Sequence, residues 1–418
     1  MSKNFEISRR NLLGTGAATV GASALGWPQM ALAATDINYI HHFTSQTEMG
    51  GLAEIMKQFG AANSEINVTQ ENIPNAEYMA KFSSAVISNS RADTAMVNED
   101  RISDMVAMDG LIDITDRVDS WGKKSFFSDV CWDGATINGK TWGVPAFSFV
   151  YWQYCRTDWL DEAGIDKAPA TFDEFVEAAI AITDPSKGRY GFGLRGGGGG
   201  HSMLLDVLDS YKALIYEDGG AEFDIPQAVK AVKFYSDLYT KYKVCQPSAP
   251  SDSYRQIMEG FRTGQTGMVW HHTGSLTEIT SALTTDQFGT SLRPAGPDAH
   301  IARVSYLYNG VMSDRNEQAS WDWISQWGEV DSAIALLQAT GYFPATSEVA
   351  SDPRVTENPL YKAASDTLAI GVPSPKIVGF DGWSRNSMLQ NFQKVLVGDS
   401  TPQEAVDEMA RTLARETG

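Results

Sequence analysis

Residues 138–175 read NGKTWGVPAFSFVYWQYCRTDWLDEAGIDKAPATFDEF, and the order of local signals in this stretch decides the fold. The Asn-Gly pair at 138–139 lies between two alternating segments, which predicts a β-hairpin with a two-residue turn. Pro145 predicts the end of the second hairpin strand, because proline lacks the N–H donor that a central strand requires. An aromatic-rich extended segment follows. Thr171 and Glu174 then have the spacing of a capping box, which predicts the start of a helix.

The same alternation of strands and helices recurs on both sides of this stretch. Residues 36–41 and 66–69 read as strands, and between them Leu52, Ile55, Met56 and Phe59 recur at helical spacing. A strand, a helix and a strand with short connections form a βαβ unit, which predicts a parallel sheet whose strand ends open on a cleft. Further helices are predicted around Trp323 and from Thr401. The fold class is therefore α/β.

The N-terminal residues read as an export signal. Ser8-Arg9-Arg10-Asn11-Leu12-Leu13 is a twin-arginine pattern, and Ala31-Leu32-Ala33 has the small residues of a cleavage site. The apolar stretch between them is too short and too rich in glycine to span a membrane. We expect residues 1–33 to be a twin-arginine signal peptide and the mature protein to be periplasmic.

Composition limits the classes of function. The formal net charge is −19 over 418 residues, which excludes binding to a phosphate backbone, since nucleic-acid-binding proteins need a basic face. About 385 mature residues exceed what one core usually supports, so two lobes are expected. Cys131, Cys155 and Cys245 lack a CxxC spacing. One disulfide is compatible with this odd count, but its pairing is left open, and thiol or metal chemistry has no support.

Segments spread over most of the mature chain resemble the family of bacterial extracellular solute-binding proteins that includes maltose-binding protein. Each segment alone is a weak signal, and their common order is a strong one. Trp142 and Cys155 depart from the tyrosine and asparagine usual in the family. The matching segments are GKTWGVP at 139–145, YC at 154–155, AG at 163–164, ATFDEF at 170–175, FRTGQTGM at 261–268, GYFPA at 341–345 and TPQEA at 401–405.

This resemblance implies a two-lobe periplasmic-binding-protein fold of type II, in which each lobe is a sheet flanked by helices and hinge strands connect the two. By analogy, lobe 1 comprises residues 34–148 plus 299–345, and lobe 2 comprises residues 149–298 plus 346–418. Such proteins close on a small-molecule ligand and deliver it to the membrane permease subunits of an ABC transporter. The resemblance implies a monomeric carrier that is not an enzyme and needs no cofactor.

The five consecutive glycines 196–200 require an explanation. The pattern GFGLRG at 191–196 formally matches the dinucleotide fingerprint. That fingerprint has to follow a buried strand, whereas a polar turn at 184–189 precedes it here. Alternation over residues 190–194 predicts that the pattern is itself a strand. We therefore do not favour a nucleotide site.

A flexible linker is a second explanation for the glycines, but the run is short and lies between a strand and a predicted helix. We favour a strand-to-helix loop at the edge of the cleft. Backbone N–H groups of Gly196 and Gly197 would approach a ligand there, near the positive end of a helix. The neighbouring Arg195 adds a positive charge. This combination suits a carboxylate, a sulfonate or a phosphate on the ligand.

Polar residues after predicted strands are the next candidates. His42 and Gln46 belong to the turn after the first strand, which should open into the cleft, and are the preferred donors. Asn98 and Asp100 follow the strand at 94–97. Asp100 suits paired hydroxyl groups or, equally, the cap of the helix that follows.

Two adjacent histidines follow the strand at 268–270 and invite a zinc interpretation. Neighbouring residues of a strand point in different directions, and no carboxylate stands at ligand spacing, so no metal site is favoured. His272 and Thr273 are instead expected to bind the ligand through hydrogen bonds, and a purely structural role of the histidines is the alternative.

Aromatic side chains suit the apolar faces of sugar rings. By resemblance, Trp383 falls where the family places a stacking aromatic, and Arg385 could pair with an anionic group or form a salt bridge. The remaining candidate contacts lie near the hinge or on later interlobe loops, and they are Phe147, Tyr151, Asn309 and Tyr342.

The expected ligand is a sugar or a sugar derivative, and an anionic one is compatible with Arg195. A glycerol phosphodiester and a polyamine are the alternatives within the family, although only Glu99 and Asp100 form a suitable acidic cluster for an amine. An exported glycoside-active enzyme is the alternative outside it. The mature sequence lacks the G-x-S-x-G and H-E-x-x-H patterns, but two carboxylates placed in space for glycoside hydrolysis leave no sequence motif.

Overall fold

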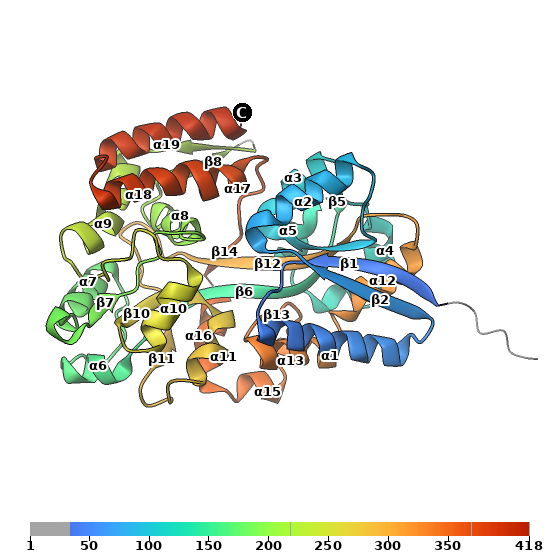
Figure 1. The fold of residues 1–418 in the computed structure, drawn as a ribbon, viewed down its shortest axis with the longest axis horizontal. Helices are drawn as coiled ribbons and strands as arrows, with labels where there is room; N and C mark the ends of the chain where they lie inside the picture. The colour runs from blue at the N-terminus through green and yellow to red at the C-terminus, as the bar shows by residue number, and fades with distance from the viewer. Residues whose placement is uncertain (1–33, 218, 369, 418) are drawn as a thin grey trace, which may run out of the picture.

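The computed structural model describes residues 34–217, 219–368 and 370–417 (Figure 1). The predicted export signal at residues 1–33 lies outside the described residues. The helices run over α1 Gln46–Ala62, α2 Asn75–Ile87, α3 Ile102–Ala107, α4 Thr115–Ser120, α5 Asp129–Ala135, α6 Thr157–Glu162, α7 Phe172–Ala181, α8 His201–Ser210, α9 Ile225–Thr240, α10 Tyr254–Arg262, α11 Leu276–Thr280, α12 Glu317–Gln326, α13 Val330–Thr340, α14 Ser347–Ala350, α15 Pro353–Thr356, α16 Lys362–Leu368, α17 Phe380–Trp383, α18 Leu389–Val397 and α19 Pro402–Thr417.

One sheet extends through the described chain in the strand order β2-β1-β3-β12-β6-β10-β7. Its strands are β1 Thr35–His41, β2 Ile66–Asn72, β3 Thr94–Asn98, β6 Val144–Cys155, β7 Tyr190–Phe192, β10 Thr266–His272 and β12 Ala302–Val311. The shorter strands β11 Gly289–Ser291 and β13 Phe343–Pro344 pair with β6, and β14 Gly371–Val372 pairs with β12. Two separate hairpins consist of β4 Thr136–Ile137 with β5 Lys140–Thr141, and of β8 Leu214–Glu217 with β9 Gly220–Phe223.

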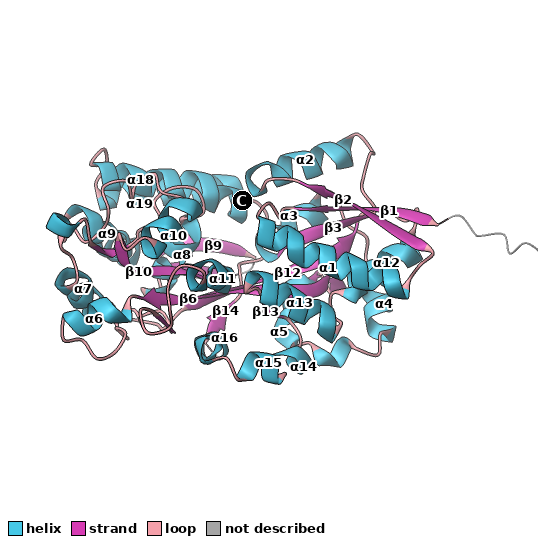
Figure 2. Cartoon of the chain, turned by 60° about the horizontal axis from the view of Figure 1, so that its bottom comes forward, coloured by secondary structure: helices cyan, strands magenta, loops and turns pink. Residues whose placement is uncertain are grey.

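Two lobes share this sheet, and the long strands β6 and β12 run from one lobe into the other (Figure 1). The first half of β6 pairs with β12, which also pairs with β3, and the second half of β6 pairs with β10. The strands β1, β2 and β3 are parallel, as the βαβ pattern predicts. Helices lie on both sides of the strands in each lobe (Figure 2). The predicted α/β two-lobe fold is confirmed.

Each lobe has its own hydrophobic core. In the first lobe, Tyr39, Leu52 and Trp323 belong to one buried cluster. In the second lobe, Phe175 and Trp270 belong to another. A third cluster packs under the crossing strand β6. Separate cores allow the lobes to move as units about the strands that join them.

Local signals of the sequence explain most helix and turn positions. In the predicted hairpin, Asn138 and Gly139 have φ angles of 53° and 73°, as a two-residue turn of this type requires. The amide of Glu174 donates to the hydroxyl of Thr171 at 3.2 Å, which is one half of the predicted capping box. The Glu174 carboxylate accepts from the amide of Ala170 at 2.8 Å and not from that of Thr171. The face of α1 that was predicted to be buried contains Leu52, and its N-terminus carries a capping box.

Pro145 corrects one expectation, because it lies inside β6 rather than ending a strand. It is the second residue of β6 and lies opposite Tyr308, next to the position where the pairing register shifts. Proline is tolerated at strand starts and at bulges, since no ladder hydrogen bond is required from its nitrogen there. The hairpin therefore leads directly into the crossing strand.

The three cysteines are buried and free. No helix in the described part of the chain combines the length and the apolar character needed to cross a membrane.

Candidate ligand-binding site

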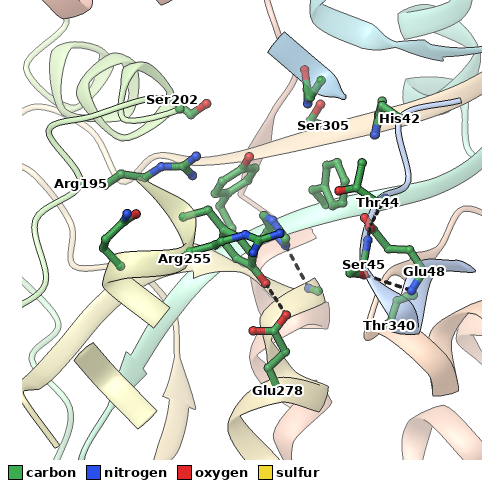
Figure 3. Close-up of a pocket in the computed structure, with 18 of the residues that line it drawn as sticks. His42, Thr44, Ser45, Glu48, Arg195, Ser202, Arg255, Glu278, Ser305 and Thr340 are labelled. Carbon is green, nitrogen blue, oxygen red and sulfur yellow. Dashed lines mark hydrogen bonds between the residues drawn. The ribbon is translucent and has the colours of Figure 1, made fainter. Parts of the chain in front are cut away.

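A cavity of about 1180 Å³ lies where the two lobes face each other (Figure 3). The loops that follow the carboxyl ends of β1, β3, β7 and β10 contribute to its wall, and β6 and β12 supply side chains from the crossing region. Open α/β sheets bind ligands at the carboxyl ends of their strands. The cavity therefore lies where the topology of the sheet predicts a binding site.

Aromatic side chains form the floor of this cavity. Phe149 and Tyr151 are two residues apart on β6 and therefore share one face of the strand. The ring of His272 lies 4.6 Å from that of Phe149 and 5.7 Å from that of Tyr151. Tyr254 stacks on His272 at 6.0 Å, and Tyr342 meets Phe149 edge to face at 4.8 Å. Such a surface suits the C–H face of a sugar ring.

Several buried polar atoms at the cavity have no hydrogen-bond partner among the described residues. They include His42 Nε2, Asn98 Oδ1 and His201 Nδ1, which come from three different elements. An unpartnered buried polar atom is destabilising, so natural proteins retain few of them, often at functional positions. Their convergence on one cavity indicates that a polar ligand completes them.

The histidines of the cavity are uncharged at neutral pH. Burial, followed by the charge of Arg101, lowers the pKa of His42 to about 4. Burial and the charge of Arg195 lower the pKa of His272 to about 3. Its Nδ1 accepts a hydrogen bond from the amide of Gly274 at 3.1 Å. A neutral imidazole offers one donor and one acceptor, which suits hydroxyl groups.

The glycine run folds around Arg195. The Arg195 Nε donates to the carbonyl oxygen of Gly198 at 2.8 Å, and its Nη1 lies 3.3 Å from His271 Nε2. A Cβ atom at Gly199 would overlap the guanidinium, and one at Gly200 would overlap the carbonyl oxygen of Arg195. The run is therefore a strand-to-helix loop, as predicted, and its C-terminal half makes room for an arginine.

Gly196 and Gly197 correct the expected role of the loop's first half. Both are buried and do not line the cavity. Their amides donate to the carbonyl oxygens of Ala249 and Asp252, and a Cβ atom at either glycine would overlap the backbone of residues 249–252. Their lack of a side chain serves close packing of two loops within the second lobe. Neither glycine lies in the wall of this cavity, where a ligand contact was expected.

An ion-pair network joins the lobes at one side of the cavity. Arg385 contacts Asp100 of the first lobe and Asp381 of its own segment, each at 2.5 Å. Asp381 also faces Arg101 at 3.5 Å, and both of these side chains are buried. Arg385 thus forms a salt bridge, which was one of its two predicted roles, but the bridge joins the lobes and was expected on the surface. Its charge is already compensated, which does not favour its role as an anion-binding group.

Asp100, His201 and Asp381 place their ligand atoms within 4.8 Å of one another, as a cation site would. Both carboxylates are paired with Arg385, and Asp381 also faces Arg101. Two guanidinium groups disfavour a further cation at this place. The cluster is an ion-pair network, and its residues do not fit a metal ion.

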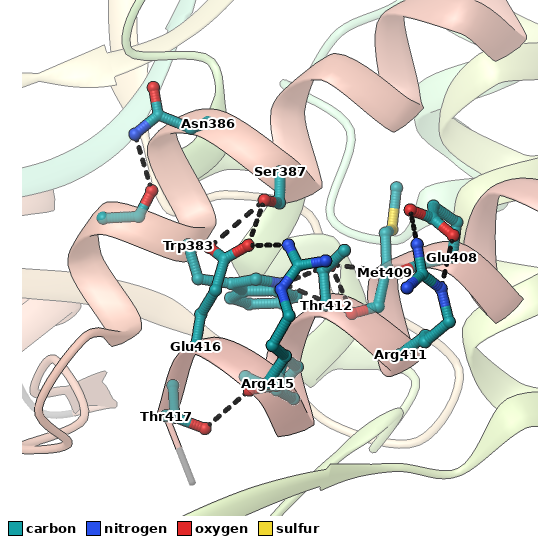
Figure 4. A network of polar contacts seen from close by, with 12 residues as sticks. Trp383, Asn386, Ser387, Glu408, Met409, Arg411, Thr412, Arg415, Glu416 and Thr417 are labelled. Atoms are coloured by element: carbon teal, nitrogen blue, oxygen red, sulfur yellow. Dashed lines mark hydrogen bonds and ion pairs between the residues drawn. The ribbon is translucent and has the colours of Figure 1, made fainter.

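Some predicted contacts belong to the core instead. Trp383 is fully buried, and its Nε1 donates to Thr412 Oγ1 at 3.0 Å, with Met409 O at 3.2 Å (Figure 4). Helix α19 covers this indole, so it is not available for stacking on a ligand. Asn309 is buried and accepts a hydrogen bond from the hydroxyl of Tyr39 at 2.8 Å.

Phe147 and Thr273 also lie outside the cavity wall. Phe147 stacks on Tyr342 at 4.9 Å, and of these two residues only Tyr342 lines the cavity. Thr273 is fully buried behind the end of β10. The sequence-predicted residues that do line the cavity are His42, Gln46, Asn98, Asp100, Tyr151, Arg195, His272, Tyr342 and Arg385.

The structure also adds cavity residues that the sequence did not indicate. Phe149 lies between Phe147 and Tyr151 on the same face of β6, so strand alternation could have found it. Tyr254 and Glu278 come from α10 and α11, and the hydroxyl of Tyr254 donates to Glu278 Oε1 at 3.1 Å. No local motif marks these two positions.

Comparisons with known proteins agree with this architecture. The model of the bacterial extracellular solute-binding protein family matches residues 54–363. A Brucella abortus protein named only as a binding protein is 23% identical over 367 residues, which are 85% of this chain and 87% of that protein. The erythritol/L-threitol-binding protein of Mycolicibacterium smegmatis is 26% identical over 203 residues, which are 45% of this chain and 42% of that protein.

Solved structures show the same fold. Maltose-bound MalE3 of T. maritima superposes with a TM-score of 0.83 at 21% identity, covering 91% of this chain and 100% of that chain. A solute-binding protein of Agrobacterium vitis with bound D-mannitol has a TM-score of 0.78 at 19% identity, covering 92% of this chain and 98% of that chain. The match to the family extends over most of the described residues. The chain belongs to the bacterial extracellular solute-binding protein family.

Proposed function

We propose that this protein is the substrate-binding component of an ABC importer. In this role it binds a sugar or a sugar derivative, including an anionic one, between its lobes and delivers it to the permease. Membership of the solute-binding family supports the carrier role. The relatives named for maltose, D-mannitol and erythritol or L-threitol share polyhydroxylated ligands, which supports this ligand class.

The observation that carries this proposal is the chemistry of the interlobe cavity. Its floor combines Phe149, Tyr151 and His272, and its wall presents His42 Nε2 and Asn98 Oδ1 as buried atoms without partners. Sugar sites combine aromatic faces for the ring with polar groups for the hydroxyls. Asp100 is a poor site for an amine, because Arg385 already neutralises its carboxylate.

A ligand in this cavity would contact both lobes at once. Binding to both walls favours the conformation in which the lobes are closed, and the closed form is the one that we propose docks on the permease. The proposed lobes comprise residues 34–148 plus 299–345 and residues 149–298 plus 346–418, connected through β6 and β12. We further propose that the protein acts in the periplasm as a monomer and does not convert its ligand.

A thermal-shift screen with sugars, sugar alcohols, uronic acids, sulfonated sugars and glycerol phosphodiesters tests this function. A ligand at 100 times its Kd should stabilise the protein by about 2.7 kcal/mol. Tyr151→Ala should abolish most of the shift, whereas Tyr216→Ala, which alters an exposed tyrosine of β8, should retain it. Product formation during incubation with the ligand would identify an enzyme instead. Stabilisation by polyamines alone would refute the proposed ligand class.

A further inference from the structure

Arg195 differs from the other arginines of the cavity. The charges of Arg262, Arg303 and Arg385 are each paired with a carboxylate, from Glu259, from Asp206 and Asp209, and from Asp100 and Asp381, respectively. Arg255 is exposed to solvent. Among the described residues, no carboxylate forms an ion pair with Arg195, although its side chain is at least half-buried.

The groups that act most strongly on Arg195 are tyrosines and another arginine. Burial lowers its pKa to about 10, and the neighbouring groups that act on it are Tyr151, Arg385, Tyr254 and Tyr235. Withdrawing a guanidinium from water without a carboxylate is costly. Among the described residues Arg195 therefore has no ion-pair partner, although the carboxylates of Glu48 and Glu278 line the same cavity.

Two structural features fix the direction of this guanidinium. On one side, the carbonyl of Gly198 accepts from Nε, and the absence of a side chain at Gly199 leaves space for Nη2. Gly199 has a φ angle of +88°, a conformation that favours glycine. The glycine run thus holds Arg195 at the cavity wall, which Gly199 itself also lines.

On the other side, the imidazole of His271 contacts Nη1 of Arg195. His271 is fully buried, and its Nδ1 lies 2.8 Å from the hydroxyl of Ser275. Burial lowers its pKa well below the usual value, so the ring is neutral and its Nε2 accepts from Arg195 at 3.3 Å. Arg195 lines the cavity, and its guanidinium is directed into it (Figure 3).

We propose that Arg195 is the group that recognises an oxoanion on the ligand, and that His271 and Gly199 are its positioning residues. This inference rests on the proposed function, and it narrows the ligand to a sugar or polyol derivative with a carboxylate, sulfonate or phosphate group. A planar guanidinium donates to two oxygens of such a group, which binds it strongly and with a defined orientation.

The test is isothermal titration calorimetry of the full mature chain with matched pairs of probes. Hexuronates, hexose 6-sulfonates and hexose 6-phosphates are each compared with the parent hexose in the gluco, galacto and manno series. One acidic class should bind more tightly than its parent sugar, and which class does so identifies the anion. Arg195→Gln should weaken that ligand roughly 10- to 100-fold and leave the affinity for the parent hexose unchanged. Lys230→Gln removes one positive charge from an exposed position of α9 and should change neither affinity.

The positioning residues are tested by the ratio of the two affinities, which a loss of stability alone would not change. His271→Leu should lower the preference for the anionic probe, and His271→Gln should restore part of it, because an amide oxygen can accept from Nη1. Gly199→Ala should also lower the preference for the anionic probe. Gly188→Ala is the matched control, because Gly188 has a φ angle of +69° and no atom near its missing Cβ.

The possible failures are distinguishable. If neutral hexoses bind more tightly than every acidic partner, the anion site is wrong and the sugar carrier stands. If simple oxoanions without a polyol part, such as glutarate or inorganic phosphate, bind more tightly than every sugar, the anion site stands and the proposed ligand class is wrong. If no probe binds, both are rejected.

Discussion

Glu99 should make the stability of the unliganded protein fall as the pH rises. It follows β3 directly, between Asn98 and Asp100, and only 1% of its surface is exposed. Its Oε2 accepts from the amide of Tyr306 at 2.9 Å, and its Oε1 has no partner among the described residues. Burial raises the pKa of Glu99 from 4.5 to about 8. The folded protein therefore keeps this carboxyl protonated at neutral pH.

The sign and size of the effect follow from this shift. Between pH 4.5 and about pH 8 the folded state holds a proton that the unfolded state has lost. The stabilising contribution of Glu99 is complete below pH 4.5 and is lost as the pH rises through the folded pKa. Each pH unit in this window lowers the free energy of unfolding by ~1.4 kcal/mol. From pH 5 to pH 7.5 the loss amounts to roughly 3 kcal/mol.

The assay is urea unfolding of wild type and Glu99→Gln at half-unit steps from pH 5 to pH 8. Glutamine keeps the acceptor for the amide of Tyr306 and cannot ionise. The free energy of unfolding of the variant, relative to that of wild type, should therefore rise by roughly 3 kcal/mol between pH 5 and pH 7.5. Glu177→Gln, on the exposed face of α7, should follow the wild-type curve. Parallel curves for wild type and Glu99→Gln would show that Glu99 is charged in the fold and would refute the reasoning.

Three further predictions follow from the fold and the cavity. Trp383→Ala should lower the free energy of unfolding by ~3–5 kcal/mol in urea titrations, because the indole belongs to the hydrophobic core. The affinity measured by calorimetry should stay unchanged, and a loss of affinity without a loss of stability would show that Trp383 contacts the ligand. Phe149→Ala should weaken ligand binding by about tenfold in calorimetry through loss of the aromatic floor, and an unchanged Kd would place the ligand elsewhere. Arg385→Met, which breaks the pair with Asp100, should give a larger radius of gyration for the unliganded protein in solution scattering, whereas an identical profile would show that this pair does not hold the lobes together.

Some local structure could be predicted because it depends on neighbours in sequence. The turn at Asn138-Gly139 needs two residues that accept positive φ, and the start of α7 needs only the spacing of Thr171 and Glu174. Pro145 shows the limit of such rules, since its place within β6 depends on the bulge opposite Tyr308, far away in the sequence.

Candidate site residues were predicted less well where the exposure of a side chain depends on elements that pack on it from elsewhere in the chain. Trp383 and Phe149 are both aromatic, yet α19 covers the former, while the latter faces the cavity. The glycine run illustrates the same difficulty. Its position between a strand and a helix was predicted, but its contacts with Arg195 and with residues 249–252 arise only in the fold.

The sequence by itself determined several strands, helices and turns, because hydrophobic periodicity, capping residues and turn residues act over a few positions along the chain. The family was indicated by the common order of the matching segments. Only the tertiary structure decided which polar and aromatic side chains face the cavity and which charges are compensated. Burial and ion pairing depend on groups that come together from distant segments, as Arg385 and Asp100 do across the two lobes. Arg195 is the clearest case, since its lack of a carboxylate partner is a property of three-dimensional surroundings that no local pattern contains.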